Sequence, residues 1–179
     1  MIRGNRITLR AVERDDLPRY VAWLNDPEVT YHLSPLLPFN LDDETEWYEQ
    51  QRKDDSQLNL AIVINDGEQH IGSVGLMHLD HRNQQAELGI VIGEKSQWAQ
   101  GYGRKAIDLL LHFAFTELNL NRVYLRVDAS HSSAIRSYLS CSFQEEGRLR
   151  EAVYHHGRFE DHLIMSVLRA EYQGGEKVP

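Results

Sequence analysis

The sequence predicts a mixed α/β fold, in which an antiparallel meander of strands leads into one central parallel βαβ unit. Three observations indicate this fold class. Short apolar runs follow one another from residue 58 to residue 92, with turn residues between them. An amphipathic segment at residues 107–118 interrupts the series, and a further strand-like run at 122–127 follows it. The strands at residues 87–92 and 122–127 must be parallel, because the helix between them is a crossover connection.

The N-terminal third predicts one strand and two helices joined by a loop that contains prolines. Alternating polar and apolar residues indicate the strand. We expect an acidic side chain to begin each helix, because a carboxylate accepts the free N–H groups of a first turn. Asp15 or Asp16 would cap the first helix, and Asp42 or Asp43 the second. The elements are a strand at residues 6–10, a helix ending near residue 24, a loop at 25–40 and a helix ending near residue 53.

The rest of the chain predicts the sheet and the helices that cover it. A nearly continuous apolar run at residues 87–92 indicates a strand that is covered on both faces. The apolar residues of 107–118 recur at helical spacing, so one face of this helix packs on the sheet. Ser132 or Ser133 would cap the next helix. The other elements are strands at residues 58–64, 71–79, 122–127, 148–154 and 163–168, and a helix ending near residue 139.

Composition narrows the classes of function. The 179 residues, 41% of them apolar, are enough for one good core, and we expect one domain at residues 1–172 with a disordered tail at 173–179. A net charge of −8 argues against a nucleic-acid partner and favours a cationic one, such as an amine. Cys141 is the only cysteine, which excludes an internal disulfide. Because no apolar run has the length of a signal peptide or a membrane span, we expect a cytoplasmic protein without a membrane partner.

Two glycines stand directly in front of the amphipathic helix, in the stretch WAQGYG at residues 98–103. The free N–H groups and the positive dipole end of a helix N-terminus attract anions. Glycine at positions 101 and 103 lets a phosphate approach the backbone without meeting a Cβ. The loop therefore predicts a ligand that contains phosphate, and a tight loop without a ligand is the alternative.

Two other phosphate-binding motifs fit the loop less well. A Walker A loop is excluded, because Gly103 is followed by Arg-Lys-Ala, which places no hydroxyl group for Mg²⁺. The dinucleotide pattern G-x-G-x-x-A does match residues 101–106, and Asp128 stands where an acid that binds ribose would lie. However, eight residues separate the preceding strand from Gly101, whereas this fingerprint needs a tight turn.

The loop and several further segments resemble the GNAT acetyltransferase superfamily. Residues 98–103 are similar to its Q/R-x-x-G-x-G/A motif, with Trp98 where Gln or Arg is usual. This departure occurs in the RimJ/RimL-type branch of ribosomal-protein N-terminal acetyltransferases and in its polyamine-acetylating relatives. The resemblance extends from about residue 6 to 172 and implies a GNAT-type fold, with the parallel pair splayed to admit coenzyme A. The other similar segments are residues 8–17, 23–28, 71–76, 86–90, 134–138, 146–152 and 161–165.

This resemblance implies which residues bind the cofactor acetyl-CoA. Backbone amides of the splayed strand would pair with pantetheine, and amides of the glycine loop would hold the pyrophosphate. Gly89 suits a bulge that turns an N–H group toward the thioester. His131 replaces the asparagine of the family, and its imidazole can still donate a hydrogen bond to pantetheine. The expected cofactor-binding residues are Ile90, Ile92, Trp98, Gln100, Gly101, Gly103, Arg104 and His131.

The resemblance also suggests two catalytic residues. Tyr138 stands at the tyrosine position of the family, where a phenol can protonate the departing thiolate. Glu87 begins the splayed strand and could take the proton of the ammonium group, if partial burial raises the pKa of this carboxyl group. The alternatives are that Tyr138 only packs its helix on the sheet, that Glu87 is structural, and that a chain of water molecules acts as the base.

The implied activity is direct transfer of an acetyl group to a primary amine in a ternary complex. A protein or peptide N-terminus is the first expectation for the acceptor. A small amine (polyamine, amino sugar or antibiotic) and a silent acyl-CoA-binding module are the alternatives. We expect no metal, because His78/His81 and His155/His156 lack clustered cysteines or a carboxylate at ligand spacing, and the resemblance also admits a homodimer. The expected acceptor-binding residues are Glu28, Tyr31 and His78.

Overall fold

The structure is a computed structural model that describes residues 1–33, 38–155 and 157–174. The predicted disordered tail therefore lies, from residue 175 on, outside the described residues. The helices are α1 (Leu17–Leu24), α2 (Leu41–Gln51), α3 (Tyr102–Thr116) and α4 (Ser132–Leu139), with 3₁₀ turns η1 (Arg14–Asp16) and η2 (Lys95–Gln97). The strands are β1 (Ile2–Arg3), β2 (Ile7–Ala11), β3 (Leu58–Ile64), β4 (His70–Asp80), β5 (Gln85–Ile92), β6 (Arg122–Asp128), β7 (Gln144–His155) and β8 (Arg158–Leu168).

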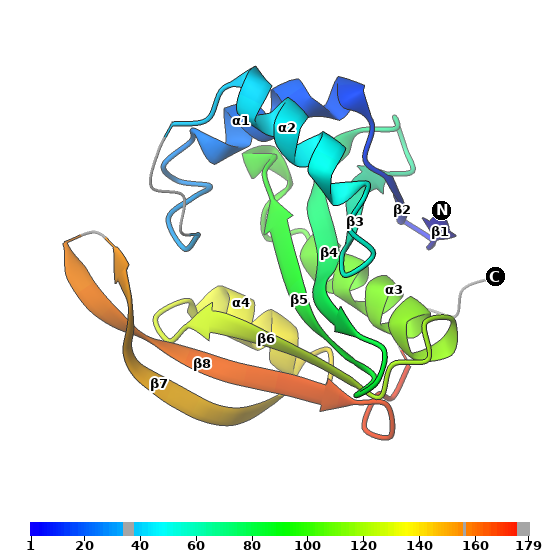
Figure 1. Cartoon of the computed structure of the whole chain (residues 1–179), viewed down its shortest axis with the longest axis vertical. Helices are drawn as coiled ribbons and strands as arrows, with labels where there is room; N and C mark the ends of the chain where they lie inside the picture. Colours follow the sequence, from blue (N-terminus) through cyan, green and yellow to red (C-terminus); the bar gives the residue numbers. More distant parts are fainter. Residues whose placement is uncertain (34–37, 156, 175–179) are drawn as a thin grey trace.

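The strands form one sheet in the order β1-β2-β3-β4-β5-β6-β8-β7 (Figure 1). Neighbouring strands are antiparallel except for β5 and β6, which are parallel and joined through α3. This is the predicted mixed α/β class, an antiparallel meander followed by one parallel βαβ unit. The two-residue strand β1 was not predicted, because two residues are too few to show a periodic pattern.

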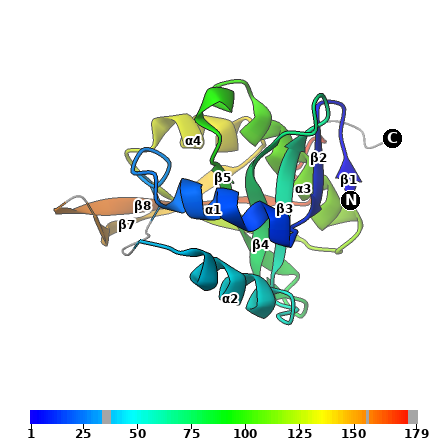
Figure 2. The same cartoon turned by 90° about the horizontal axis from the view of Figure 1, so that it is seen from above.

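Helices cover both faces of the sheet (Figure 2). On the face that we call the α3 face, helix α3 buries Ile107, Leu110 and Leu111 against the sheet. On the opposite face, the α1 face, Tyr20 and Trp23 of α1 pack with Tyr48 of α2. Each core excludes apolar surface from water at a gain of roughly 25 cal/mol per Å². The two cores hold the helical layers on opposite faces of the sheet.

The parallel pair separates soon after it begins. In the described residues its register ends at Glu87 opposite Tyr124, although β5 continues to Ile92 and β6 to Asp128. β5 keeps pairing with β4 over this length, and β6 keeps pairing with β8 up to Asp128. The two strands therefore diverge, as Figure 1 shows. The predicted splayed pair is confirmed.

The sequence predicted the N-cap residue of α1 but not that of α2. Asp16 is the N-cap residue of α1, yet its carboxylate accepts the Glu13 N–H at 2.9 Å and pairs with the Arg10 guanidinium at 2.7 and 2.8 Å, and it accepts no N–H group of the first turn of α1. Helix α2 is capped by Asn40, whose side chain accepts the N–H groups of the next two aspartates at 2.7 and 3.1 Å. Asp43 in return accepts the Asn40 N–H at 2.9 Å, which completes a capping box.

Among the described residues, no helix is long and apolar enough to cross a membrane.

Candidate active site

The glycine loop lies at the end of β5 on the α3 face. A Cβ added to Gly103 would be 3.8 Å from Ile92 Cγ1 and 3.9 Å from Ile90 Cδ1, so these two side chains point toward the start of α3. The indole N–H of Trp98 donates to the Ile92 carbonyl at 2.7 Å, and the Gln100 amide donates to the Ser96 carbonyl at 3.1 Å. The first bond holds the loop against the strand that borders the gap, and the second lies within the loop.

The backbone of the loop fits an anion. Gly101 is the N-cap of α3 with φ of +80°, a conformation that favours glycine, and it offers no side chain to the first-turn N–H groups. A Cβ added to Gly101 would meet no atom of the described residues within 4 Å. Arg104 lies in the first turn, 3.9 Å from Asp108, with 58% of its side chain exposed. The loop therefore combines open backbone donors with one nearby positive charge.

A cavity of about 170 Å³ lies over β4 and β5 on the α1 face. The predicted bulge at Gly89 is wrong, because the pairing runs regularly through Gly75 opposite Gly89. The irregularity falls in β4 between Met77 and Asp80, where His78 has a φ of +52°. The cavity is lined by Leu33, Asn59, Ser73, Val74, Gly75, Met77, Gly89, Ile90 and Val91.

Glu87 sits at the vertex where β5 and β6 still pair. Its carboxylate accepts two hydrogen bonds from Arg126, at 2.9 and 3.0 Å, and lies 3.2 Å from His78 Nδ1. Burial raises the pKa of Glu87, but the hydrogen bonds and charge of Arg126, together with His78, outweigh it and lower the pKa below its usual value. The raised pKa that we expected for this residue is therefore wrong.

Tyr138 lies on α4, the helix that follows β6. It belongs to the core of the α3 face, and its ring centroid is 5.7 Å from that of Phe143. Burial raises the pKa of its phenol to about 12. The group therefore carries its proton throughout the neutral range, as a proton donor must.

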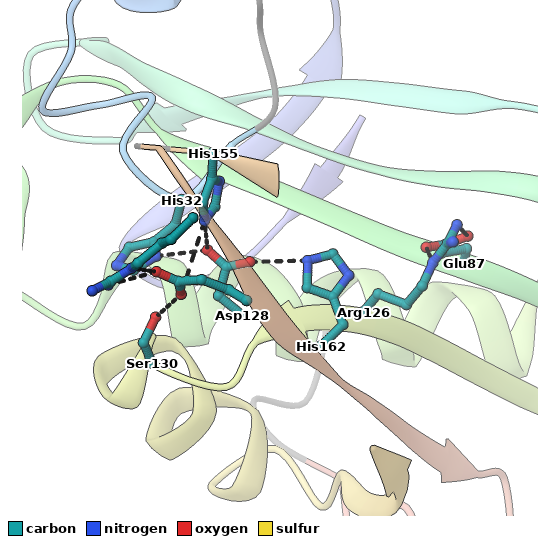
Figure 3. A network of polar contacts seen from close by, with 9 residues as sticks. His32, Glu87, Arg126, Asp128, Ser130, His155 and His162 are labelled. Atoms are coloured by element: carbon teal, nitrogen blue, oxygen red, sulfur yellow. Dashed lines mark hydrogen bonds and ion pairs between the residues drawn. The ribbon is translucent and has the colours of Figure 1, made fainter. Parts of the chain in front are cut away.

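Asp128 ends β6 and gathers histidines from three other elements (Figure 3). His32 Nδ1 is 2.8 Å and His162 Nε2 is 2.9 Å from its carboxylate oxygens, and His155 Nε2 lies 3.4 Å away. The sequence suggested Asp128 only as an acid that binds ribose. These histidines were missed as a group, because their positions in the chain share no spacing.

His131 occupies the N-cap of α4, and Ser132 is the first helical residue, so the predicted serine cap is wrong. The imidazole of His131 stacks on that of His32, with centroids 3.8 Å apart and planes 11° from parallel. Burial, and next the charge of His32, lower the pKa of His131 to about 4. His131 is therefore neutral at neutral pH, and a neutral imidazole carries the one N–H that our prediction requires.

The three expected acceptor-binding residues do not meet at one point. Glu28 pairs with Lys95 at 2.5 Å, and the Tyr31 ring meets that of His32 edge-on at 4.9 Å. These two residues lie on the segment between α1 and α2. His78 instead contacts Glu87 near the vertex of the gap.

Among the described residues, Asp128, His155 and Glu160 bring three ligand-type atoms within 4.8 Å of one another. This group differs from the histidine pairs that the sequence offered. His78 contacts Glu87 instead, and His156 lies outside the described residues.

Comparison with known proteins gives a family and several relatives. Residues 6–144 match the acetyltransferase (GNAT) domain. The chain is 33% identical over 171 residues to spermidine N(1)-acetyltransferase of Vibrio cholerae, with 94% of this chain and 96% of the relative covered. It is 32% identical over 173 residues to the uncharacterized N-acetyltransferase p20 of Bacillus licheniformis, at 94% and 96% coverage. A putative ribosomal N-acetyltransferase of Bacillus subtilis, YdaF, is 31% identical over 103 residues, 58% of this chain and 56% of its own.

A solved structure agrees with the first of these relatives. The spermidine N-acetyltransferase of Vibrio cholerae in complex with CoA and spermine superimposes with a TM-score of 0.88 at 29% identity, over 94% of this chain and 99% of that one. The relatives matched over nearly the whole chain thus include polyamine acetyltransferases, whereas the ribosomal-type relative is matched over little more than half of it.

Proposed function

Because the chain belongs to the GNAT acetyltransferase family, we propose that it transfers the acetyl group of acetyl-CoA to a primary amine of a polyamine such as spermidine. It is an N-acetyltransferase, and acetyl-CoA is its co-substrate. The polyamine replaces the peptide N-terminus as the preferred acceptor. The observation that carries this choice is the similarity over nearly the whole chain to an acetyltransferase that acts on spermidine.

The chemistry of the α1 face supports a cationic, aliphatic acceptor. The cavity over β4 and β5 has mostly aliphatic walls, with Asn59 and Ser73 as polar groups, which suits methylene units between amines. The net charge of −8 attracts polycations over long range. Glu28 and Tyr31 lie on the same segment as Leu33, which lines the cavity. We propose that both residues contact the acceptor.

Acetyl-CoA is proposed to enter from the α3 face. Backbone amides of Gln100, Gly101, Gly103 and Arg104 would bind the pyrophosphate, because they stand at a helix N-terminus that an anion can approach closely. The pantetheine arm would pass through the gap, where the free edge of β5 at Ile90 and Ile92 can pair with its amides. Trp98 would act indirectly, by holding the loop in place, because its indole N–H already donates to the Ile92 carbonyl.

Two side chains are proposed to complete this half of the site. Tyr138 would protonate the departing thiolate, because a phenol with a pKa of about 12 is protonated at neutral pH and a thiol has a pKa of about 8.5. His131 would donate its N–H to pantetheine. Glu87 stays a predicted base by position alone, and its ion pair with Arg126 favours a role in holding the vertex of the gap.

A panel of acceptors tests the proposal. The purified enzyme is incubated with acetyl-CoA and, separately, with spermidine, spermine, putrescine, an amino sugar or N-terminal peptides, and released CoA is measured with a thiol reagent. We expect release with spermidine at a kcat/KM at least about tenfold above that with any peptide. Release with peptides alone would restore the first expectation. Binding of acetyl-CoA in calorimetry, without release for any amine, would indicate a silent binding module.

A further inference from the structure

Among the described residues of the segment between α1 and α2, His32 reaches across the open end of the gap. This residue follows α1, which packs over the β2–β4 half of the sheet, yet its ring contacts Asp128 at the end of β6 and His131 at the start of α4. Leu33, the next residue, lines the cavity beside Gly89 and Ile90. His32 thus lies between the wall of the proposed acceptor cavity and the end of the strand that borders the gap.

The Asp128 carboxylate fixes the tautomer of His32. Only 2% of the Asp128 side chain is exposed, against 24% of that of His32. An ionised carboxylate only accepts hydrogen bonds, so the His32 Nδ1 at 2.8 Å must carry the proton. In the neutral ring the proton is then absent from Nε2, which is left with a lone pair. A buried carboxylate that binds one nitrogen of a partly exposed imidazole is the arrangement that orients a histidine as a general base.

The other histidines of the cluster are less suited to this task. His162 lies on β8, which borders β6 on the side away from β5. His155 is 11% exposed and lies between Asp128 and Glu160, at 3.4 and 3.9 Å. His131 has a pKa lowered to about 4 by burial, so it is a weak base. His32 is the member that adjoins the cavity wall.

We propose that His32 is the general base that takes a proton from the acceptor ammonium group, and that Asp128 is the residue that positions it. This inference rests on the proposed acetylation of an amine. It names a base other than Glu87, whose carboxylate is held by two hydrogen bonds from Arg126.

The proton balance closes with the groups named. One N–H bond of the ammonium breaks, and the proton passes to His32 Nε2 and then to solvent, while the Asp128 carboxylate stabilises the imidazolium. The amine lone pair forms a bond to the carbonyl carbon of the thioester, and the C–S bond breaks. Tyr138 gives its phenol proton to the sulfur and regains one, through solvent, from the new amide nitrogen. Each turnover consumes one ammonium ion and releases one proton.

Several charged and titratable groups surround His32, and the pH dependence of the reaction can also reflect their titration. They come from every element packed against it and are Asp128 on β6, His131 at the start of α4, His155 on β7, Glu160 and His162 on β8, and Tyr31 on its own segment.

The test compares His32→Gln with the parent enzyme and with His81→Gln, a control at an exposed histidine in the β4–β5 turn. The acceptor is whichever amine the parent uses fastest in the panel. We expect kcat of H32Q to fall roughly 100-fold near pH 7, within the usual range for a general base, with the KM for acetyl-CoA unchanged. The deficit should shrink as pH rises and the free amine becomes abundant. Imidazole in the buffer should restore part of the activity of His32→Ala.

Asp128→Asn tests the positioning role. An asparagine amide can donate to Nδ1 and so favour the wrong tautomer, as is known for triad enzymes. This variant should lose kcat and show the same altered pH profile as H32Q, with acetyl-CoA affinity in calorimetry kept.

Two results would overturn the proposal. One is an H32Q variant within about threefold of the parent at every pH, and the other is a loss that is constant with pH and not restored by imidazole. If the parent enzyme releases CoA with spermidine and H32Q does so at the same rate, only the assignment of His32 as the base is overturned. A parent that releases none with any amine overturns the proposed function as well.

Discussion

The two faces of the gap between β5 and β6 are built from different parts of the chain. On the α3 face the proposed phosphate-binding part of the site consists of backbone groups in one short stretch, residues 98–104, at the start of a helix. On the α1 face the site consists of side chains that three other elements bring to Asp128. A backbone site tolerates many side chains but depends on φ and on open space. A side-chain cluster depends on residue identity and on the tertiary fold that assembles it.

The largest expected effect comes from closing the backbone site. Gly101→Val should lower acetyl-CoA affinity at least about 100-fold, because a β-branched residue is strained at a φ of +80° and its methyl groups occupy the path to the helix N–H groups. Titration calorimetry with acetyl-CoA measures this loss.

Gly67→Val is the matched control, since Gly67 has a φ of +78° in the β3–β4 turn and an equally open Cβ position. It should lose a similar amount of stability and keep acetyl-CoA affinity. If both variants bind acetyl-CoA normally, the α3 face does not bind through its backbone.

The next effect in size concerns a single side-chain atom on the same face. Tyr138→Phe should reduce kcat at least about tenfold and leave the KM for acetyl-CoA nearly unchanged, because only the proton donor is removed. Steady-state kinetics measure both constants. Tyr20→Phe, which alters a buried tyrosine in the core of the α1 face, is the control and should leave kcat unchanged. Equal kcat for the parent and Tyr138→Phe would assign the thiolate proton to another group.

The difference between the faces explains how much the sequence could predict. The mixed sheet, its parallel pair and the glycine loop each depend on contiguous residues, whose periodicity or spacing is visible in the chain. The pairing of His32 with Asp128 joins residues 96 positions apart, and no local pattern records it. The family resemblance did not help here, because it directs attention to motif positions such as Glu87 and Tyr138.

Errors at single residues had a related cause. Asp16 stands at the predicted N-cap of α1, but its carboxylate is buried against Arg10, lies 3.1 Å from His70 and accepts no N–H group of that helix. Glu87 was expected to have a raised pKa because it starts a covered strand, yet Arg126 from the neighbouring strand lowers it. In both cases a cationic side chain on a different element, Arg10 of β2 or Arg126 of β6, decided the outcome.

A smaller effect is expected on the stability of the vertex, where Glu87 pairs with Arg126. Glu87→Gln should lower the free energy of unfolding by about 1 kcal/mol at pH 7, because the ion pair with the half-exposed Arg126 is lost. The folded pKa of Glu87 is depressed, so its stabilisation is present above the unfolded pKa and disappears as pH falls through the folded value. The stability gap between parent and variant should therefore close in acid, as urea unfolding at pH 7 and pH 3 will measure.

Glu146→Gln is the control for this measurement. The hydrogen bonds from Ser166 and Arg122 also lower the pKa of Glu146, but 41% of its side chain is exposed, so loss of the ion pair with Arg122 should cost less, roughly 0.5 kcal/mol or below. A gap for Glu87→Gln that is equally large in acid would mean that packing, and not the ion pair, stabilises the vertex.

The smallest expected effect tests the backbone character of the α3 face directly. Trp98→Phe keeps an aromatic ring and removes the N–H that donates to the Ile92 carbonyl at 2.7 Å. A hydrogen bond contributes about 0.5–1.5 kcal/mol net, so acetyl-CoA affinity should fall roughly 2- to 12-fold, near the lower end because the indole is partly exposed. Calorimetry with acetyl-CoA measures the change, and kcat should stay the same. A loss as large as that of Gly101→Val would contradict the contrast between the faces, since a side chain would then be as necessary to the α3 face as the glycine backbone that it supports.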